Sequence, residues 1–538
     1  MANEDDEYDY EGEDDQEEVL ESFEKPQWLR NMPYWALSAF LHLVLLMIFV
    51  NVIVDSGKGD EQAVPIEVRT PPKPPEYDPT LKRDVKKTPK LLNKEVTDPV
   101  IKRKIDEVAL EIPKGTDLDN MTNVDLQQQS IHDVVGVGAG AGAYGERRGR
   151  GSLNTEGGGG TEEAVRAALE WLWRHQSPDG SWKSSDFLEQ CKAKCTSEDA
   201  KRYGDGRGIA EFDVGVTGLA ILAFAGYGHT HRDGVHPKFV ASLKKAVNYL
   251  KKVQDKSGNP PGDGRYGKGD GDAEQWIYNH AIATLAMAEL LVMSGDVIGL
   301  KKSVTDAVKL CLRAQNDERG WRYGIKPGDS DTSVTGWMVL ALKTAKNADL
   351  DTSDISPDQY KGALQGALTW FNFATAANGK AGYVAPGDAG SRLATIPEPY
   401  PYSKDLSCMT AVAVLCRLFA GESRTTQAVR DGVKILMKEV PRWQEQKGRA
   451  TSTINLYYWY YGSYALFQYG GAPWKAWNED MKKALLETQR AGNIDEDGSW
   501  DPIGEWGVAG GRVYSTAIGA MTLEVYYRFR RLQSGVEF

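Results

Sequence analysis

The stretch LEWLWRHQSPDGSW, residues 169–182, ends an amphipathic helical pattern in a turn that holds Gln176, Gly180 and Trp182. Glycine allows the positive φ of a tight turn, glutamine can hydrogen-bond the turn backbone, and tryptophan can cover helix ends. We expect such turns to fasten one helix pair to the next. The same order recurs at Gln315, Gly320 and Trp321 and at Gln489, Gly498 and Trp500.

Six amphipathic segments alternate with six that carry little charge and many small residues. The amphipathic segments are residues 162–176, 239–254, 300–315, 360–374, 425–440 and 477–489. The apolar segments are residues 213–226, 279–295, 331–345, 406–421, 456–471 and 514–528. A polar face marks a helix half exposed to water, whereas the apolar segments fit helices buried on nearly all sides. Six such pairs can close into a ring, so we predict an all-α (α/α)6 toroid over residues 161–538.

The repeat number and the Gln/Gly/Trp turns resemble the squalene cyclase and protein prenyltransferase superfamily, whose fold is this toroid. Residues 169–182, the CKAKC loop at 191–195 and SDTSVTGWMVLALKTAKNA at 330–348 look like the prenyltransferase/squalene oxidase repeat proteins of planctomycete-type bacteria. The resemblance covers the whole predicted toroid. It implies an isoprenoid or other apolar ligand inside the ring.

The sequence GDSDTSVTGW, residues 328–337, places Asp329 and Asp331 just before an apolar helix. Terpene cyclases of the resembled superfamily protonate their substrate with the middle Asp of Asp-x-Asp-Asp-Thr. Aligning Asp331 with the last Asp puts Ser330 at the acid position, where serine cannot supply the proton. A shifted frame leaves Asp329 as the donor, paired with Asp331. The alternative is that Asp331 or Ser330 caps the helix.

A zinc site of the prenyltransferase kind would need an Asp-x-Cys pair and a later His. The nearest match, Asp405 to Cys408, is one residue too long, and no histidine follows His280. We therefore predict no metal and no cofactor. The loop with His229, His231 and His236 and the Gly/Asp-rich turns at 262–272 and 495–501 are weaker metal candidates, with plain turns as the alternative.

The starts of the apolar helices should open at one end of the ring, because the repeats run in parallel. They would bring together polar and aromatic groups, which is the usual basis for expecting a ligand site. The alternative is that the polar groups cap helices and the rings fill the bore; for His280 the choice lies between a base and a neutral core histidine. The candidates are Asp213, Asn279, His280, Asp331, Trp337, Asp405, Tyr457, Tyr458, Arg512 and Tyr514.

The segment before the toroid divides into an acidic tail (1–30), an apolar helix (31–55) and a Pro-, Lys- and Gly-rich linker (56–160). Residues 33–54 carry no formal charge and are long enough to cross a bilayer. Ser38 and His42 share one face of that helix, which indicates a functional pair inside the membrane; the alternative is a pair near the helix end that hydrogen-bonds locally or to water. The segment resembles the energy-transducing protein TonB, which implies contact of Ser38 and His42 with an ExbB/ExbD-type motor, a cytoplasmic N-terminus and a toroid in the periplasm.

Charge and cysteine content narrow the possible partners. The net charge of −12 belongs to the tail, because without residues 1–24 the chain has 63 acidic against 64 basic residues. We therefore expect no nucleic-acid partner. Cys191 and Cys195 lie in a polar loop, where an oxidising compartment could link them.

Two functions are compatible with these patterns. One is a membrane-anchored binding or coupling module that contacts lipid and a motor protein. The other is a terpene cyclase-like enzyme with Asp329 or Asp331 as the acid and an isoprenoid in the bore.

Overall fold

The computed structural model describes most of the predicted toroid. The described residues are 157–192, 205–258, 263–267, 276–348, 350–388, 407–443, 445–446, 449–450, 454–492 and 494–528. Several predicted features lie outside these residues: the acidic tail, the membrane helix with Ser38 and His42, most of the linker, Cys195 and Asp405. One described helix, α8, is long and apolar enough to cross a membrane, and 83% of its most apolar window is buried inside the protein, as in a core helix.

Six outer helices alternate along the chain with six inner ones, as the periodicity predicts. The outer helices are α4 (Glu162–Arg174), α7 (Pro237–Val253), α9 (Val297–Ala314), α11 (Pro357–Ala374), α13 (Gln427–Leu436) and α15 (Gly471–Leu486). The inner helices are α6 (Asp213–Gly226), α8 (Trp276–Ser294), α10 (Thr332–Lys346), α12 (Cys408–Phe419), α14 (Leu456–Tyr469) and α16 (Gly507–Leu523). Smaller elements are η3 (Phe187–Gln190), η4 (Ala210–Phe212), α17 (Val525–Arg528) and the short antiparallel pair β1 (Glu445–Gln446) and β2 (Arg449–Ala450).

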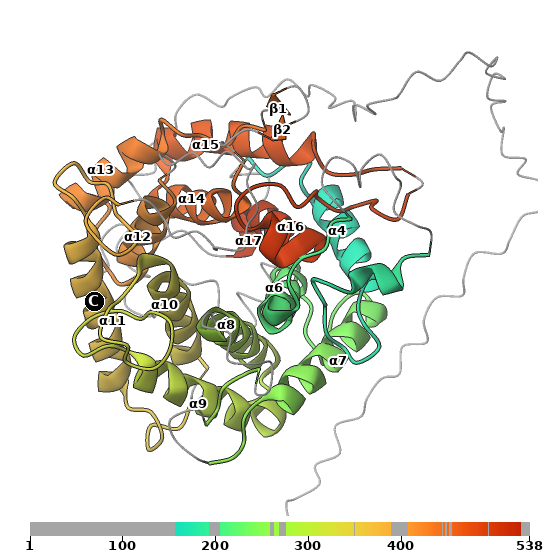
Figure 1. Cartoon of the computed structure of the whole chain (residues 1–538), viewed down its shortest axis with the longest axis horizontal. Coiled ribbons are helices and arrows are strands. Elements are labelled where there is room, and N and C mark those ends of the chain that lie inside the picture. The colour runs from blue at the N-terminus through green and yellow to red at the C-terminus, as the bar shows by residue number, and fades with distance from the viewer. Residues whose placement is uncertain are drawn as a thin grey trace, which may run out of the picture. The chain divides into compact units, whose positions relative to one another are not determined.

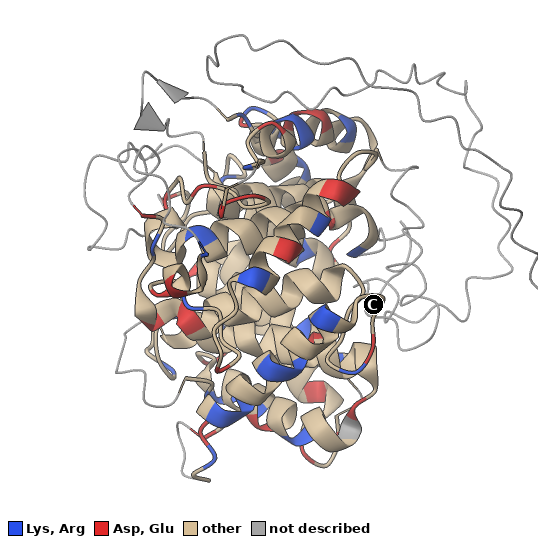
Figure 2. Ribbon diagram, turned by 90° about the vertical axis from the view of Figure 1, so that its right-hand side faces the viewer, with Lys and Arg blue, Asp and Glu red and all other residues tan. Residues whose placement is uncertain are grey.

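The inner helices form a closed ring. Each packs on the next from α6 through α8, α10, α12 and α14 to α16, and α16 packs back on α6. The outer helices surround this ring, as Figure 1 shows in projection. Charged residues lie mainly on the outer helices and turns (Figure 2), so the apolar surface faces inward. The predicted all-α toroid is confirmed.

The glutamine at the end of an outer helix joins two neighbouring repeats. The Gln176 side-chain amide donates to the carbonyl of Gly180 in its own turn (2.9 Å) and to that of Ser242 in the next outer helix (3.0 Å). Gln489 does the same with Gly498 and with Ala164 of α4 (2.8 and 2.7 Å), which closes the ring. Gln254, which the sequence pattern did not single out, bonds in the same way to Gly264 and Ser303.

The turn residue that follows is fixed to both helices of its pair. The indole N–H groups of Trp182, Trp321 and Trp500 donate to outer-helix carbonyls at 2.7–2.8 Å. Backbone N–H groups of the turns donate to one recurring side chain of the inner helix, which we call the repeat acceptor. The repeat acceptors are Thr217, His280, Thr335, Thr410 and Thr516.

One turn departs from the glycine pattern. Gly180 and Gly498 have φ near +90° and press against the next outer helix. In the turn that follows Gln315, Arg319 stands where Gly180 stands in the first turn, because the Gln315 side-chain amide donates to the Arg319 carbonyl. The close approach is made possible instead by Gly366 of α11, where a Cβ atom would lie 2.7 Å from the Arg319 carbonyl oxygen. Gly320 therefore stands one place later than the sequence alignment suggests.

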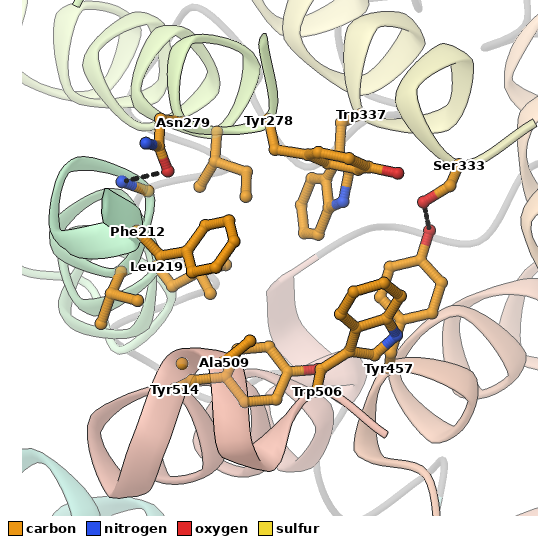
Figure 3. A pocket seen from close by; sticks show the side chains of 14 residues that line it. Phe212, Leu219, Tyr278, Asn279, Ser333, Trp337, Tyr457, Trp506, Ala509 and Tyr514 are labelled. Atoms are coloured by element: carbon orange, nitrogen blue, oxygen red, sulfur yellow. Dashed lines mark hydrogen bonds between the residues drawn. The ribbon is translucent and has the colours of Figure 1, made fainter. Parts of the chain in front are cut away.

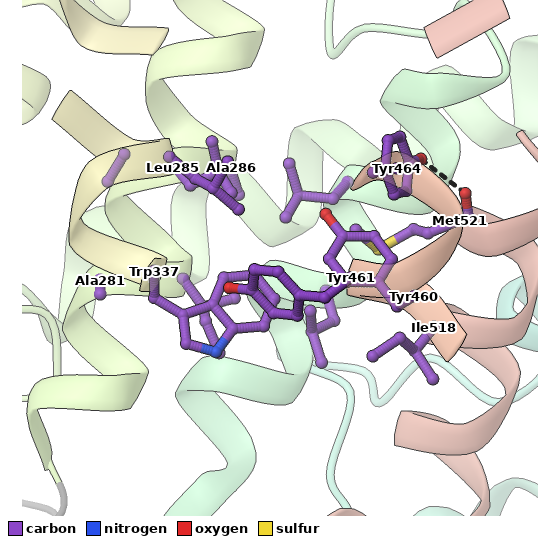
Figure 4. Packing of buried hydrophobic residues seen from close by; sticks show 14 of the residues in the cluster. Ala281, Leu285, Ala286, Trp337, Tyr460, Tyr461, Tyr464, Ile518 and Met521 are labelled. Atoms are coloured by element: carbon purple, nitrogen blue, oxygen red, sulfur yellow. Dashed lines mark hydrogen bonds between the residues drawn. The ribbon is translucent and has the colours of Figure 1, made fainter. Parts of the chain in front are cut away.

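Side chains close the bore of the ring. Trp337 stacks on Tyr460 (ring centroids 5.9 Å apart), and Tyr460 packs edge-on against Tyr464 (4.8 Å), as Figure 4 shows. Towards the C-terminal ends of the inner helices, buried Arg528 donates to both carboxylate oxygens of Glu289 (2.8 and 2.9 Å) and to the Leu222 carbonyl. Among the described residues, these buried side chains fill that end of the ring.

Candidate functional site

A pocket lies at the opposite end, where the inner helices start. Its empty space is about 590 Å³, including its open mouth. Aromatic rings make up much of its wall (Figure 3), and they come from the starts of α8, α10, α14 and α16 and from the segments just before α6 and α16. The lining residues are Phe212, Gly215, Val216, Leu219, Tyr278, Asn279, Ile282, Ser333, Trp337, Tyr457, Trp506, Ala509, Gly510 and Tyr514.

The repeat acceptor explains which positions face the pocket. Residues two before it and two after it are four apart, so they lie on the same helix face. Gly215 and Leu219 hold these positions on α6, Tyr278 and Ile282 on α8, and Ser333 and Trp337 on α10. Tyr514 holds the first position on α16. On α12 this position is Cys408, whose Sγ receives the Asn455 side-chain amide (3.4 Å) and which does not line the pocket.

Four sequence candidates meet in the pocket: Asn279, Trp337, Tyr457 and Tyr514. The Asn279 side chain bridges α8 to α6, since its Oδ1 accepts from the Gly215 N–H (3.2 Å) and its amide donates to the Glu211 carbonyl (2.5 Å). The Tyr457 and Ser333 hydroxyls are hydrogen-bonded at 2.9 Å. The buried Tyr514 hydroxyl has no hydrogen-bond partner among the described residues, and burial raises its pKa well above the usual value.

Asp331 lies just behind the pocket wall. Its side chain is the N-cap of α10, and one carboxylate oxygen accepts from the Val334 N–H at 2.7 Å. The second oxygen is buried without a hydrogen bond of ordinary geometry in the described structure. Burial raises the pKa of Asp331 to about 7, against the weaker opposing effects of the Val334 N–H and of Arg322. A carboxyl group in this state holds its proton close to neutral pH.

Asp329 is placed differently. Its side chain is 58% exposed and forms an ion pair with Arg322 at the surface. Asp331 thus caps α10, which is the alternative that the sequence left open, while Asp329 faces solvent.

Three further candidates lie outside the pocket lining. Asp213 accepts from the backbone and hydroxyl of Ser184 (2.7 and 2.8 Å), and burial raises its pKa to about 6. Arg512 pairs with Asp501 (2.8 Å). Tyr458 packs edge-on against Trp477.

His280 is one turn inside its helix, because α8 begins at Trp276 rather than near Asn279. Its Nδ1 accepts from the Tyr266 N–H (3.2 Å) and its Nε2 lies 3.1 Å from the Ala307 carbonyl, so Nε2 carries the proton. Burial lowers the pKa of His280 to about 3. The side chain serves as a repeat acceptor, in the place of threonine.

The other histidine loop holds itself together. His231 Nε2 lies 2.8 Å from an Asp296 carboxylate oxygen, and the His229 ring stacks on Tyr227 and His236. Within the part of the chain that the structure describes, no three His, Cys, Asp or Glu side chains form a group suited to a metal ion.

Sequence reasoning missed Phe212, Tyr278, Ser333 and Trp506 as pocket residues. Tyr278 and Ser333 would have been found by aligning the apolar helices on the repeat acceptors rather than on their small residues. For α8 that alignment needs His280 to be recognised in the place of a threonine. Phe212 and Trp506 precede inner helices, where the periodicity of the helix gives no signal.

No protein-family model matches the chain, and no curated protein matches it. Several solved structures do. The alpha-1,6-mannanase GH76A of Salegentibacter sp. HEL1_6 is 10% identical, with a TM-score of 0.41 over 68% of this chain and 98% of its own. An alpha-amylase from Clostridium perfringens is 13% identical (TM-score 0.43, 68% and 97%). Unsaturated glucuronyl hydrolase from Bacillus sp. GL1 is 11% identical (TM-score 0.42, 68% and 96%).

These comparisons correct the expected family. The similar structures named here are a mannanase, an amylase and a glucuronyl hydrolase, not squalene cyclases or prenyltransferases. The interpretation as a planctomycete-type prenyltransferase/squalene oxidase repeat protein is therefore wrong, and so are the two functions derived from it, the binding or coupling module and the isoprenoid cyclase. Similarity at this level concerns the helical fold and says nothing about individual side chains.

Proposed function

We propose that the toroid is a carbohydrate-active hydrolase that binds a sugar ring in the pocket at the start of its inner helices. The observation that carries this proposal is the aromatic wall formed by Tyr278, Trp337, Tyr457, Trp506 and Tyr514. A sugar ring has flat apolar faces that pack on aromatic rings and a hydroxyl rim that needs hydrogen-bond partners. Tyrosine and tryptophan supply both kinds of contact.

Nearly all of the accessible surface of the pocket is apolar, so a hydroxylated ligand would depend on a few hydroxyl groups of the wall becoming available when it binds. The unpartnered Tyr514 hydroxyl would gain a hydrogen bond from a sugar hydroxyl. The Ser333–Tyr457 pair on the same wall can exchange its mutual bond for bonds to the ligand. A purely apolar ligand would leave the Tyr514 hydroxyl unsatisfied.

Glycoside hydrolysis uses two carboxyl groups, one as the acid and one as the base or nucleophile, and Asp331 and Glu505 stand in the chain next to residues that line the pocket or two residues away from them. Asp331, with its pKa raised to about 7, would protonate the oxygen of the departing sugar. The half-buried Glu505, next to Trp506, would accept a proton from the attacking water. Its Oε2 is oriented by the Asn455 side-chain amide at 3.2 Å. Because Asp331 lies behind the wall, Tyr278 or Tyr457 has to shift when substrate binds.

The proposal is tested by incubating the full chain with a panel of oligosaccharides and measuring both tryptophan fluorescence and new reducing ends. The panel covers α-1,6-mannooligosaccharides, α-glucans and unsaturated glucuronyl oligosaccharides, because the fold does not select a substrate. We expect at least one to bind and be cleaved, and Asp331→Asn to lower turnover by about 10²-fold or more while binding persists.

Matched variants separate site effects from general ones. Asp329→Asn changes an exposed carboxylate two residues from Asp331 and should keep wild-type turnover. Trp506→Ala should weaken binding, whereas Trp173→Ala, on the outer helix α4 and 38% exposed, should not. Wild-type turnover in Asp331→Asn, or no sugar bound by the wild type, would rule out the proposal.

A further inference from the structure

A second reactive group lies apart from the pocket, at the end of η3. Cys191 Sγ is 3.5 Å from His175 Nε2, and Cys191 is half-buried while His175 is 1% exposed. His175 is held by stacking on Trp171, with ring centroids 4.1 Å apart and planes 20° from parallel. The pair consists of a thiol that solvent can reach and an imidazole in a fixed orientation.

The proton on the His175 ring can be assigned from its hydrogen bonds. Nδ1 lies 2.8 Å from the Trp171 carbonyl oxygen, which can only accept, so Nδ1 carries the hydrogen. Nε2 is then the basic nitrogen, and it faces the thiol. The geometry is that of a nucleophile, a base and a third group that orients the base.

A second cysteine–histidine contact in the same fold shows why this orientation matters. Cys311 Sγ is also 3.5 Å from a histidine Nε2, that of His280. There Nδ1 accepts from the Tyr266 N–H, so Nε2 carries the hydrogen and cannot take one from the thiol. Cys311 is also fully buried. The two cysteine–histidine pairs have the same Sγ–Nε2 distance. They differ in which ring nitrogen of the histidine carries the hydrogen and in whether solvent reaches the cysteine.

We propose that Cys191 and His175 form a site of covalent thiol modification, in which His175 activates the sulfur towards a low-molecular-weight disulfide. The thiol proton moves to His175 Nε2, and the thiolate attacks one sulfur of the disulfide. A new sulfur–sulfur bond forms as the old one breaks, and the departing thiolate takes the proton back from His175. The result is a mixed disulfide on the rim of the first repeat, independent of the proposed sugar site.

The test measures the rate of iodoacetamide labelling at each cysteine of the reduced full chain at about pH 6.5, where an ordinary thiol is mostly protonated. Peptide mass spectrometry resolves the sites. The reference is a peptide of residues 186–194, which keeps the local sequence of Cys191 but lacks His175. We expect Cys191 in the protein to react at least about tenfold faster than in the peptide, and His175→Gln to remove the difference.

Labelling of Cys311, Cys408 and Cys416 in the same samples reports unfolding, because all three thiols are buried. If His175→Gln exposes them, the comparison of wild type with peptide still decides. Equal rates in protein and peptide would overturn the proposal, and so would a wild-type Cys191 rate in a folded His175→Gln variant. A Cys191–Cys195 bridge in the protein as isolated, seen by mapping without reductant, would also overturn it, since the sulfur would then be part of a structural link.

Discussion

At the scale of single residues, hydrogen bonds and burial determine whether His280 and Asp331 are neutral or charged. His280 takes the place of a threonine as repeat acceptor and is buried between a backbone N–H and a carbonyl, where the imidazolium form has no room for its second proton. Asp331 caps α10 with one oxygen, and among the described residues the other has no hydrogen bond of ordinary geometry; burial then penalises the ionised form.

Replacing His280 by Gln should make folding less sensitive to acid. The folded-state pKa of about 3 lies below the ordinary value near 6.5, so the wild type loses stability as pH falls between these values. From pH 6.5 to pH 5 this loss amounts to about 2 kcal/mol for one group. Urea unfolding at both pH values should show that loss in the wild type but not in His280→Gln. An equal pH dependence in both proteins would mean that His280 titrates normally.

Asp331→Asn should stabilise the protein at alkaline pH. The pKa of Asp331 is raised, so its stabilising contribution is present in acid and is lost as pH rises from about 4 through 7. Asn keeps the cap but cannot ionise. Its advantage over wild type should be about 4 kcal/mol at pH 8 and less than about 1 kcal/mol at pH 4. Asp331→Ala, the control without a cap, should lose about 1 kcal/mol at pH 4. A destabilised Asn variant at pH 8 would contradict this account.

At the scale of elements, the turn between an outer and an inner helix determines how closely the repeats pack. Gly180 lets the turn backbone touch α7, and a Cβ atom there would lie 2.4 Å from the Lys245 carbonyl oxygen. The turn that follows Gln315 makes an equally close backbone contact, but there the glycine is Gly366 on the neighbouring helix α11. Close backbone contact is thus the fixed requirement, and either partner can meet it.

Gly180→Ala should lower the free energy of unfolding by more than about 2 kcal/mol, because it combines positive φ with a backbone clash. Gly258→Ala is the matched control: it also has positive φ, but nothing lies within 4 Å of its added carbon, so about 1 kcal/mol is expected. Urea unfolding followed by tryptophan fluorescence compares the two. Equal losses would show that φ alone matters at Gly180.

Much of this level could be predicted from the sequence, since the helical periodicity and the Gln and Trp positions are local patterns. What failed was register. In α6 the helix begins at Asp213, four residues before its repeat acceptor Thr217. The same interval before His280 gives the true start of α8 at Trp276. Because His280 was not recognised as the counterpart of a threonine, the predicted start of α8 was three residues late. The pocket depends on this register and on aromatic residues just before the helices, so only some of its wall could be predicted. The chemistry of Asp331 depends on burial, which the sequence does not show.

At the scale of the whole molecule, the last described helix fastens the ring. Arg528 follows α16, yet its guanidinium bonds to Glu289 of α8 and to a carbonyl of α6, near the start of the ring.

Arg528→Met should lower the free energy of unfolding by about 3–5 kcal/mol, because it leaves buried carboxylates without their cation. Adding Glu289→Gln and Glu524→Gln should recover part of the loss. Lys434→Met, at an exposed pair with Asp431, is the control and should change stability by less than about 1 kcal/mol. Thermal and urea unfolding measure all three, and a small effect of Arg528→Met would mean that the ring holds without this contact.

The side chains that fill the bore also bear on how a ligand would enter and leave the ring. In the described part of the chain, the stacked rings of Trp337 and Tyr460 and the Arg528–Glu289 pair fill the bore on the side opposite the mouth. A ligand of the proposed site would then enter and leave by the same mouth, so we expect a chain end, a side branch or a small molecule to bind there rather than a threaded polymer. For the proposed hydrolase, each product would have to depart before the next substrate binds, which would favour short encounters over sliding along a strand.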